Sequence, residues 1–210
     1  MRLRVATVVS GRGSNLAALL RALSQAGPAR VVLVMSEKAD AGGLAVARQY
    51  AVPTHVFNDS ADPAEWCREL AAAETDLVVL AGYLRRVPAE VIAAYRGRIL
   101  NIHPALLPRH GGRGMYGRRV HEAVLAAGDA SSGATVHLVT EEYDRGPILG
   151  QAQLSVLPDD TPDSLAARVL ELEHRLLPAA VLAAARAGHP VPFQLEAAVS
   201  HAGSSRTAES

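Results

Sequence analysis

The tripeptide Asn101-Ile102-His103 places an amide and an imidazole where both could act on one reacting group. It ends an apolar run typical of a strand, and alternate residues of a strand share one face. Asn101 offers a neutral N–H donor, and His103 offers a ring that titrates near neutral pH. Such a pair suits a carbonyl that becomes tetrahedral and carries a developing oxyanion. The alternative interpretation is a structural pair that satisfies its own hydrogen bonds.

The segment Ser10-Gly11-Arg12-Gly13-Ser14-Asn15 follows the first apolar run of the chain and precedes a helical pattern. Ligands of open α/β sheets bind at such strand ends, where glycines let the backbone approach a bound group. A helix that starts at Ser14-Asn15 presents free N–H groups and a positive dipole end to an anion. The segment lacks the third glycine of a dinucleotide fingerprint and the lysine of a Walker loop. A single phosphate is therefore the predicted ligand, and a plain tight turn with an N-cap is the alternative.

Two more polar groups are candidates for a site. Asp144 lies in the acidic segment 140–147, for which a solvated turn is the alternative interpretation. Glu173-His174 lies beside the leucines of the last helical pattern, where a surface salt bridge is the alternative.

Several classes of site are excluded by residues that the sequence lacks. The histidines do not have the spacing of metal ligands, and no HExxH pattern occurs, so no metal site is expected. No Gly-x-Ser-x-Gly elbow is present for a hydrolase triad. Lys38 is the only lysine, which leaves no other candidate for a Walker loop or a Schiff base.

Composition limits the partners and the compartment. The chain has 210 residues with 21 Lys or Arg and 21 Asp or Glu, and this balance argues against nucleic acid or an acidic membrane as partner. No apolar run approaches the roughly 18 residues of a membrane-spanning helix. Cys67 is the only cysteine, which excludes an internal disulfide and is typical of a reducing cytoplasm. At about 100–200 residues per domain, we expect one domain over 1–190 and a largely disordered tail over 191–210.

The hydrophobic pattern predicts the strands and helices that carry these residues. Short apolar runs alternate with helical patterns, which favours an α/β fold with a mostly parallel, twisted sheet and helices on both faces. Residues 103–117 are rich in Gly, Pro and Arg and are expected to form no regular element. The predicted strands are 5–9, 31–35, 54–57, 77–81, 98–102, 134–139 and 148–156, and the predicted helices are 15–26, 41–50, 63–73, 88–95, 118–127 and a last one capped by Thr161.

Five segments together resemble one known family over nearly the whole chain from Val5 to about Gly188. The chain resembles the folate-dependent phosphoribosylglycinamide (GAR) formyltransferases, which implies a formyltransferase-like fold with a Rossmann-like N-terminal half. The segments are Ser-Gly-Arg-Gly-Ser-Asn at 10–15, Leu-Ala-Gly-Tyr-Leu-Arg at 80–85, Asn-Ile-His-Pro-Ala-Leu-Leu-Pro at 101–108, Gly-Ala-Thr-Val-His at 133–137 and Asp-Arg-Gly-Pro-Ile-Leu at 144–149.

The resemblance implies an activity, substrates and site residues. The implied activity is transfer of the formyl group of 10-formyltetrahydrofolate to the glycinamide amine of GAR in purine biosynthesis, with no metal and with a monomer or homodimer as the active form. The implied catalytic set is Asn101, His103 and Asp144. GAR and its phosphate would contact Gly13, Ser14, Asn15 and Glu173. The folate would contact Arg68, Leu84, Arg85, Arg86, Val87, Asn101, Thr140, Glu141, Glu142, Tyr143 and Asp144.

The chain departs from the family pattern at several positions. The segment 109–117 is several residues longer than the commoner version, and it borders the implied site. Arg12 stands where relatives often have a small or polar residue, and Ala105 stands where they often have Ser. Contacts made by the backbone should survive both changes. Leu170 is often polar in relatives and cannot donate a side-chain hydrogen bond.

Three rival functions remain to be distinguished. A formyltetrahydrofolate deformylase is expected to carry an additional N-terminal domain, and a methionyl-tRNA formyltransferase a C-terminal domain and a basic surface. A binding module without catalysis is expected to have lost Asn101, His103 or Asp144, and all are present here.

Overall fold

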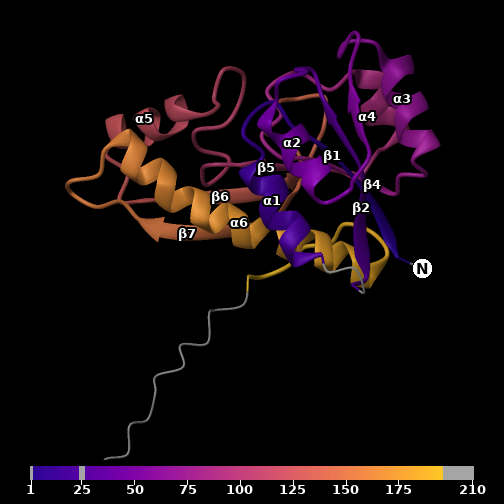
Figure 1. Ribbon diagram of the computed structural model, residues 1–210. Coiled ribbons are helices and arrows are strands. Elements are labelled where there is room, and N and C mark those ends of the chain that lie inside the picture. Colours follow the sequence, from indigo (N-terminus) through magenta and orange to yellow (C-terminus); the bar gives the residue numbers. More distant parts are fainter. Residues whose placement is uncertain (1, 24–26, 196–210) are drawn as a thin grey trace, which may run out of the picture.

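The predicted apolar runs form seven strands of one sheet in the computed structural model, which describes residues 2–23 and 27–195 (Figure 1). The strand order is β3-β2-β1-β4-β5-β6-β7. The strands are β1 (Leu3–Val8), β2 (Ala29–Ser36), β3 (Thr54–Val56), β4 (Leu77–Leu80), β5 (Ile99–His103), β6 (Ser131–Leu138) and β7 (Ile148–Ser155). The helices are α1 (Ser14–Ala22), α2 (Gly42–Gln49), α3 (Pro63–Ala72), α4 (Ala89–Ala94), α5 (Arg118–Ala126) and α6 (Pro162–Ala187).

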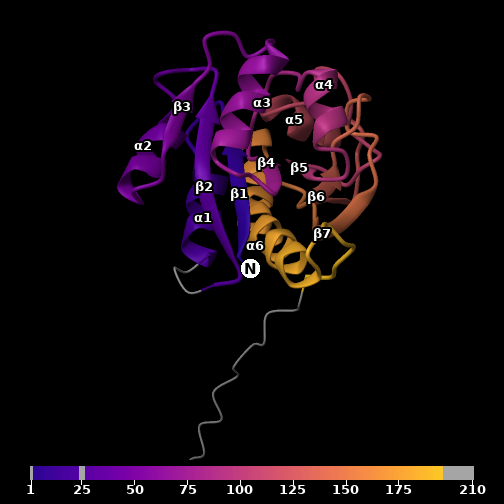
Figure 2. The same cartoon turned by 90° about the vertical axis from the view of Figure 1, so that its right-hand side faces the viewer.

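The central strands are buried on both faces, as the continuous apolar runs predict. Leu77 and Val79 of β4 belong to one apolar cluster with residues of α1, α2, α5 and α6. Val78 and Leu80 belong to a second cluster with residues of α3 and α4. Helices therefore cover both faces of the sheet (Figure 1, Figure 2), and the predicted α/β fold is confirmed.

The sheet changes direction after β5. Strands β1 to β5 pair in parallel, and their order 3-2-1-4-5 is that of a Rossmann-like half. Strand β6 pairs antiparallel with β5, and β7 pairs antiparallel with β6. In this register Asn101 lies directly opposite His137, and His103 lies opposite Thr135. The reversal brings a strand from late in the chain beside the Asn-x-His tripeptide.

Two predicted helix starts are confirmed by their capping bonds. The Asp62 carboxylate accepts from the backbone N–H of Ala64, with Pro63 in the first helical position of α3. Thr161 and Ser164 form a reciprocal capping box at the start of α6. The segment 103–117 was expected to form no regular element, and this holds for residues 104–117, whereas His103 is the last residue of β5.

The predicted tail begins with residues that contact the sheet. The backbone N–H of Phe193 donates to the carbonyl of Leu149 in β7, and a Cβ added at Gly150 would collide with the Phe193 ring. The rest of the predicted tail, 196–210, lies outside the described residues.

Candidate active site

A cavity of about 720 Å³ opens where β1, β4 and β5 end. Its walls are the segments 82–87, 101–104, 112–118 and 139–144, with further residues from the loop after β1 and from α6. This is the edge of the sheet at which the strand ends predict a ligand site. The size lies in the range of roughly 300–1,000 Å³ that suits small-molecule ligands.

Asn101 and His137 form a hydrogen-bonded pair across β5 and β6. The Asn101 Nδ2 atom lies 3.1 Å from Nε2 of His137, while Nδ1 of His137 lies 2.9 Å from the carbonyl oxygen of Leu138. Because a carbonyl only accepts, Nδ1 of His137 carries the proton and Nε2 accepts from the Asn101 amide. The second N–H of that amide remains for a ligand in the cavity.

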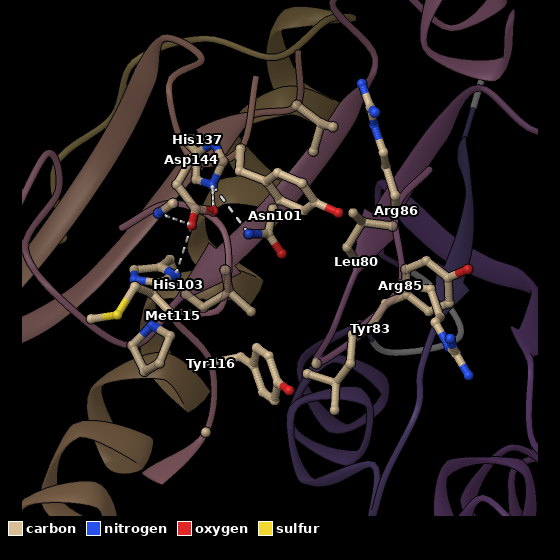
Figure 3. Close-up of a pocket in the computed structure, with 18 of the residues that line it drawn as sticks. Leu80, Tyr83, Arg85, Arg86, Asn101, His103, Met115, Tyr116, His137 and Asp144 are labelled. Carbon is tan, nitrogen blue, oxygen red and sulfur yellow. Dashed lines mark hydrogen bonds and ion pairs between the residues drawn. The ribbon is translucent and has the colours of Figure 1, made fainter. Parts of the chain in front are cut away.

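One nitrogen of the His103 ring faces a backbone carbonyl, and the other faces Asp144. Figure 3 shows the contact with Asp144. Its Nε2 atom lies 2.8 Å from the carbonyl oxygen of His110. Its Nδ1 atom lies 3.6 Å from Oδ2 of Asp144. The carbonyl fixes the proton on Nε2, so Nδ1 is the nitrogen free to take a proton beside the carboxylate.

Asp144 connects both histidines to the loop that follows β5. Its Oδ2 atom accepts from the backbone N–H of Gly112 at 2.8 Å, and its Oδ1 atom lies 3.5 Å from Nε2 of His137. The backbone of Asp144 has a φ of 54°, a left-handed conformation that aspartate adopts more readily than most residues. The solvated turn that was the alternative for this residue is wrong, because the side chain is only 12% exposed.

Burial sets the protonation of this cluster. Burial lowers the pKa of His103, and the opposing effect of the Asp144 charge does not cancel that decrease. Burial by itself raises the pKa of Asp144, but the hydrogen bond from the Gly112 amide opposes burial, and the net pKa of Asp144 is lowered. The ligand-free site therefore holds a neutral His103 beside an ionised Asp144 at neutral pH. Desolvation of the His103 ring therefore outweighs the effect of the nearby carboxylate.

The glycine loop after β1, residues 10–13, lines part of the cavity and also packs against α2. Gly11 and Arg12 line the cavity, and Gly13 adopts a φ of 79° directly before α1. The Gly11 carbonyl accepts from the Gly43 N–H at 3.0 Å, and a Cβ on Gly13 would collide with the Gly43 backbone. Gly13 is thus required for the packing of two helices, a role that the sequence alone does not distinguish from ligand approach.

Asn15 and Glu173 meet at the wall of the cavity. The Asn15 amide donates to Oε2 of Glu173 at 2.5 Å, and both side chains are buried. The Asn15 Oδ1 atom is buried with no hydrogen-bond partner. Burial raises the pKa of Glu173 to about 7, against the opposing bond from Asn15. A surface salt bridge, the alternative for Glu173, is wrong, because this carboxyl faces α1 and the cavity.

Most of the predicted folate-binding residues line the same cavity. Both implied segments do so, namely Leu84, Arg85, Arg86 and Val87, and Thr140, Glu141, Glu142, Tyr143 and Asp144.

Arg68, Gly13 and Ser14 are not among the residues that line the cavity. Arg68 lies on α3 with its side chain 60% exposed, and it pairs with Glu69. Gly13 and Ser14 belong to the junction between the glycine loop and α1.

Sequence reasoning missed two histidines and part of the long loop. His137 contacts Asn101 and Asp144, although the sequence analysis gave it no role in the site. His121 of α5 and Met115 and Tyr116 of the long loop also line the cavity. The five-residue segment ending at His137 carried a signal, because antiparallel pairing with the Asn-x-His strand places His137 opposite Asn101.

Over the described ranges, 2–23 and 27–195, the structure bears on metal binding and on a membrane span. No three His, Cys, Asp or Glu side chains there are arranged to hold a metal ion. No helix within those ranges has the length and apolar character needed to cross a membrane.

Comparisons with known proteins agree on one family. Residues 3–181 match the family described as formyl transferase. A chloroplastic phosphoribosylglycinamide formyltransferase of Arabidopsis thaliana is 45% identical over 183 residues, which cover 83% of this chain and 63% of that protein. The phosphoribosylglycinamide formyltransferase of Escherichia coli K12 is 38% identical over 183 residues, 84% of each chain. The chain thus spans less than two thirds of the length of its Arabidopsis relative.

Solved structures show the same likeness in three dimensions. Phosphoribosylglycinamide formyltransferase from Anaplasma phagocytophilum is 37% identical, with a TM-score of 0.84 over 89% of this chain and 88% of that one. The enzyme of that name from Brucella melitensis is 45% identical, with a TM-score of 0.79 over 88% and 96% of the two chains. From the matched domain and these structures together, the chain belongs to the formyl transferase family.

Proposed function

We propose that this protein transfers the formyl group of 10-formyltetrahydrofolate to the glycinamide amine of GAR, a step of purine biosynthesis. The observation that carries the proposal is the convergence of Asn101, His103 and Asp144 at the end of β5, beside a cavity of ligand size. The names of the relatives support GAR as the acceptor.

The charges around the cavity fit two anionic substrates. Arginines on several of its walls favour anions, beside four carboxyl groups, and α1 begins at its edge. The arginines are Arg12, Arg85, Arg86, Arg113 and Arg118, and the carboxyl groups are those of Glu141, Glu142, Asp144 and Glu173. GAR carries a phosphate, and the folate carries carboxylates on its glutamate. We assign the GAR phosphate to the side of residues 13–15 and the folate to the walls 84–87 and 140–144, with Arg68 as an outer folate contact. Glu173 would then meet the glycinamide portion of GAR.

The proposed reaction is direct attack without a covalent enzyme intermediate. The amine nitrogen of GAR bonds to the formyl carbon, and the formyl oxygen becomes an oxyanion. This oxyanion accepts a hydrogen bond from the second N–H of Asn101. Because His103 starts neutral, its Nδ1 can take the proton that the amine nitrogen must lose. The resulting imidazolium lies beside Asp144 and stabilises the oxyanion by charge. That proton then moves to N10 of the folate as the carbon–N10 bond breaks, which yields formyl-GAR and tetrahydrofolate.

The decisive experiment measures tetrahydrofolate formation by absorbance from 10-formyltetrahydrofolate with and without GAR. We expect turnover only when GAR is present, and no loss of rate after treatment with EDTA, since the proposed reaction uses no metal. Turnover without GAR would indicate a deformylase instead. Binding of both ligands without turnover would indicate a binding module.

The proposal also includes the domain bounds, the compartment and the oligomeric state of the protein. We propose a catalytic domain over 1–190 that acts in the cytoplasm as a monomer or homodimer on small molecules, without nucleic acid or a membrane as partner. The single cysteine, Cys67, which is unpaired, supports a reducing compartment.

A further inference from the structure

The loop that follows β5 contacts both ionisable catalytic groups through its backbone. The His110 carbonyl accepts from Nε2 of His103 at 2.8 Å, and the Gly112 N–H donates to Asp144 at 2.8 Å. These two bonds lie two residues apart on one short segment. The position of residues 109–112 therefore sets both the tautomer of His103 and the orientation of its carboxylate partner.

This loop is held from outside the cavity by one carboxylate. Asp129 follows α5, and its Oδ2 atom lies 2.6 Å from Nε2 of the His110 ring. Its other oxygen, Oδ1, pairs with Arg109. The Asp129 side chain is only 9% exposed and does not line the cavity, so it cannot touch a substrate there. We call Asp129 and the side chains of Arg109 and His110 the loop clamp.

The backbone of His110 gives the clamp its effect. Its φ of 53° is in the left-handed region, which costs free energy for a residue with a side chain. The bond between its ring and Asp129 is made in this conformation. In the same conformation its carbonyl faces His103, so one residue connects the outer carboxylate to the catalytic ring.

We propose that Asp129 and the side chain of His110 are positioning residues for the formyl transfer. The clamp fixes the His110 carbonyl on Nε2 of His103, which leaves Nδ1 unprotonated toward Asp144 and ready to take the proton of the attacking amine. The kinetic consequence rests on the proposed function, whereas the tautomer of His103 does not depend on it. A clamp with a purely structural role would stabilise the chain without any effect on His103.

The experiment compares Asp129→Asn and His110→Phe with the wild-type protein and with Asp160→Asn as the matched control. Asp160 also pairs with an arginine, Arg168, its side chain is 3% exposed, and it lies outside the cavity lining. Nitrogen-15 NMR of the histidine rings at fixed pH measures the tautomer of His103. Steady-state rates with GAR and 10-formyltetrahydrofolate give kcat and both KM values.

We expect the wild type and Asp160→Asn to keep the Nε2-protonated tautomer of His103. Both clamp variants should show a mixture of tautomers and lose about ten- to a hundred-fold in kcat, with each KM within about two-fold. An unchanged His103 tautomer in the clamp variants, or a kcat no lower than that of Asp160→Asn, would overturn the proposal. His110→Phe supplies the measurement if Asp129→Asn does not fold. Absence of wild-type turnover would reject the proposed function but leave the tautomer comparison as a valid test.

Discussion

In the proposed catalytic set, Asn101 and His103 each make one hydrogen bond that limits what the side chain can do. The Asn101 amide donates one N–H to His137, and its second N–H can donate to a ligand. The proton on Nε2 of His103 donates to the His110 carbonyl. The period of a strand predicted that Asn101 and His103 share a face, and the site confirms it. The contribution of His137 was not predictable from that period, because it depends on which strand pairs with β5 and in which register.

Replacing Asn101 by alanine removes the proposed donor for the oxyanion and takes the Asn101 amide away from Nε2 of His137. We expect kcat to fall by about 10²–10³-fold, with both KM values within a few-fold, because the bond acts mainly in the transition state. Steady-state kinetics with each substrate varied in turn measure this. A variant with normal kcat and raised KM values would make Asn101 a binding residue.

Replacing Asp144 by asparagine keeps the shape of the side chain but removes its charge. The pKa of His103, already lowered by burial, should fall further, because Asp144 is the strongest group that opposes that decrease. The imidazolium formed during transfer loses its counter-charge, so kcat should fall strongly. NMR titration of His103 in both proteins and a comparison of kcat test the two effects. An unchanged pKa together with near-normal turnover would reduce Asp144 to a loop carboxylate.

Among the structural elements, the loops were harder to predict from the sequence than the strands and helices. The predicted helices and strands agree with the observed ones to within a few residues at most ends, because capping residues such as Asp62 and Thr161 mark where helices start. The conformation of the long loop 109–117 was not predictable. Its contacts depend on Asp129 at the far end of α5 and on Asp144 in a separate loop.

The glycine loop offers a pair of variants that separates packing from ligand binding. Gly13→Val should lower the melting temperature, since the added Cβ meets the Gly43 backbone at a φ of 79°. Gly11→Val adds its Cβ where no other atom lies within 4 Å, on a residue that lines the cavity. It should raise the KM for GAR with little change in melting temperature or in folate binding. Calorimetry and kinetics measure both, and an equal rise of both KM values in Gly11→Val would contradict a phosphate site at this loop.

At the scale of the whole molecule, the alternation of strands and helices was enough to predict the fold class. The pattern marks 134–139 and 148–156 as strands but contains nothing that shows their direction, so the antiparallel end of the sheet could not be predicted. The contact between Asn15 and Glu173 joins residues 158 positions apart, and only the packing of α6 on α1 makes the glutamate a cavity residue. Its pKa could not be inferred from the last helix alone, where it reads as a surface group.

Glu173 makes stability depend on pH across this long-range contact. Its pKa rises from 4.5 to about 7 on folding, so the folded state binds the extra proton and the unfolded state does not. Stability therefore falls as pH rises from about 4.5 to about 7. Glu173→Gln stays neutral and can still accept from Asn15, so its free energy of unfolding at pH 8 should exceed that of the wild type by on the order of 3 kcal/mol. Urea unfolding at pH 8 and at pH 4.5 measures the difference, which should nearly vanish at the lower pH. A difference that does not change with pH would mean that Glu173 does not titrate in this range.

The register of β5 against β6 determines both the packing of the core and the arrangement of the site. Leu100 and Ile102 face the apolar cluster opposite Leu138 and Val136, while Asn101 lies opposite His137 on the other face. Because side chains alternate, a slip of one residue would turn His137 into the core and Val136 toward the substrates. Such a misfolded chain would bury an imidazole among apolar side chains and lose its stability along with its chemistry. A register error that disrupts the site therefore also destabilises the fold, so misregistered chains with a defective site are not stably folded.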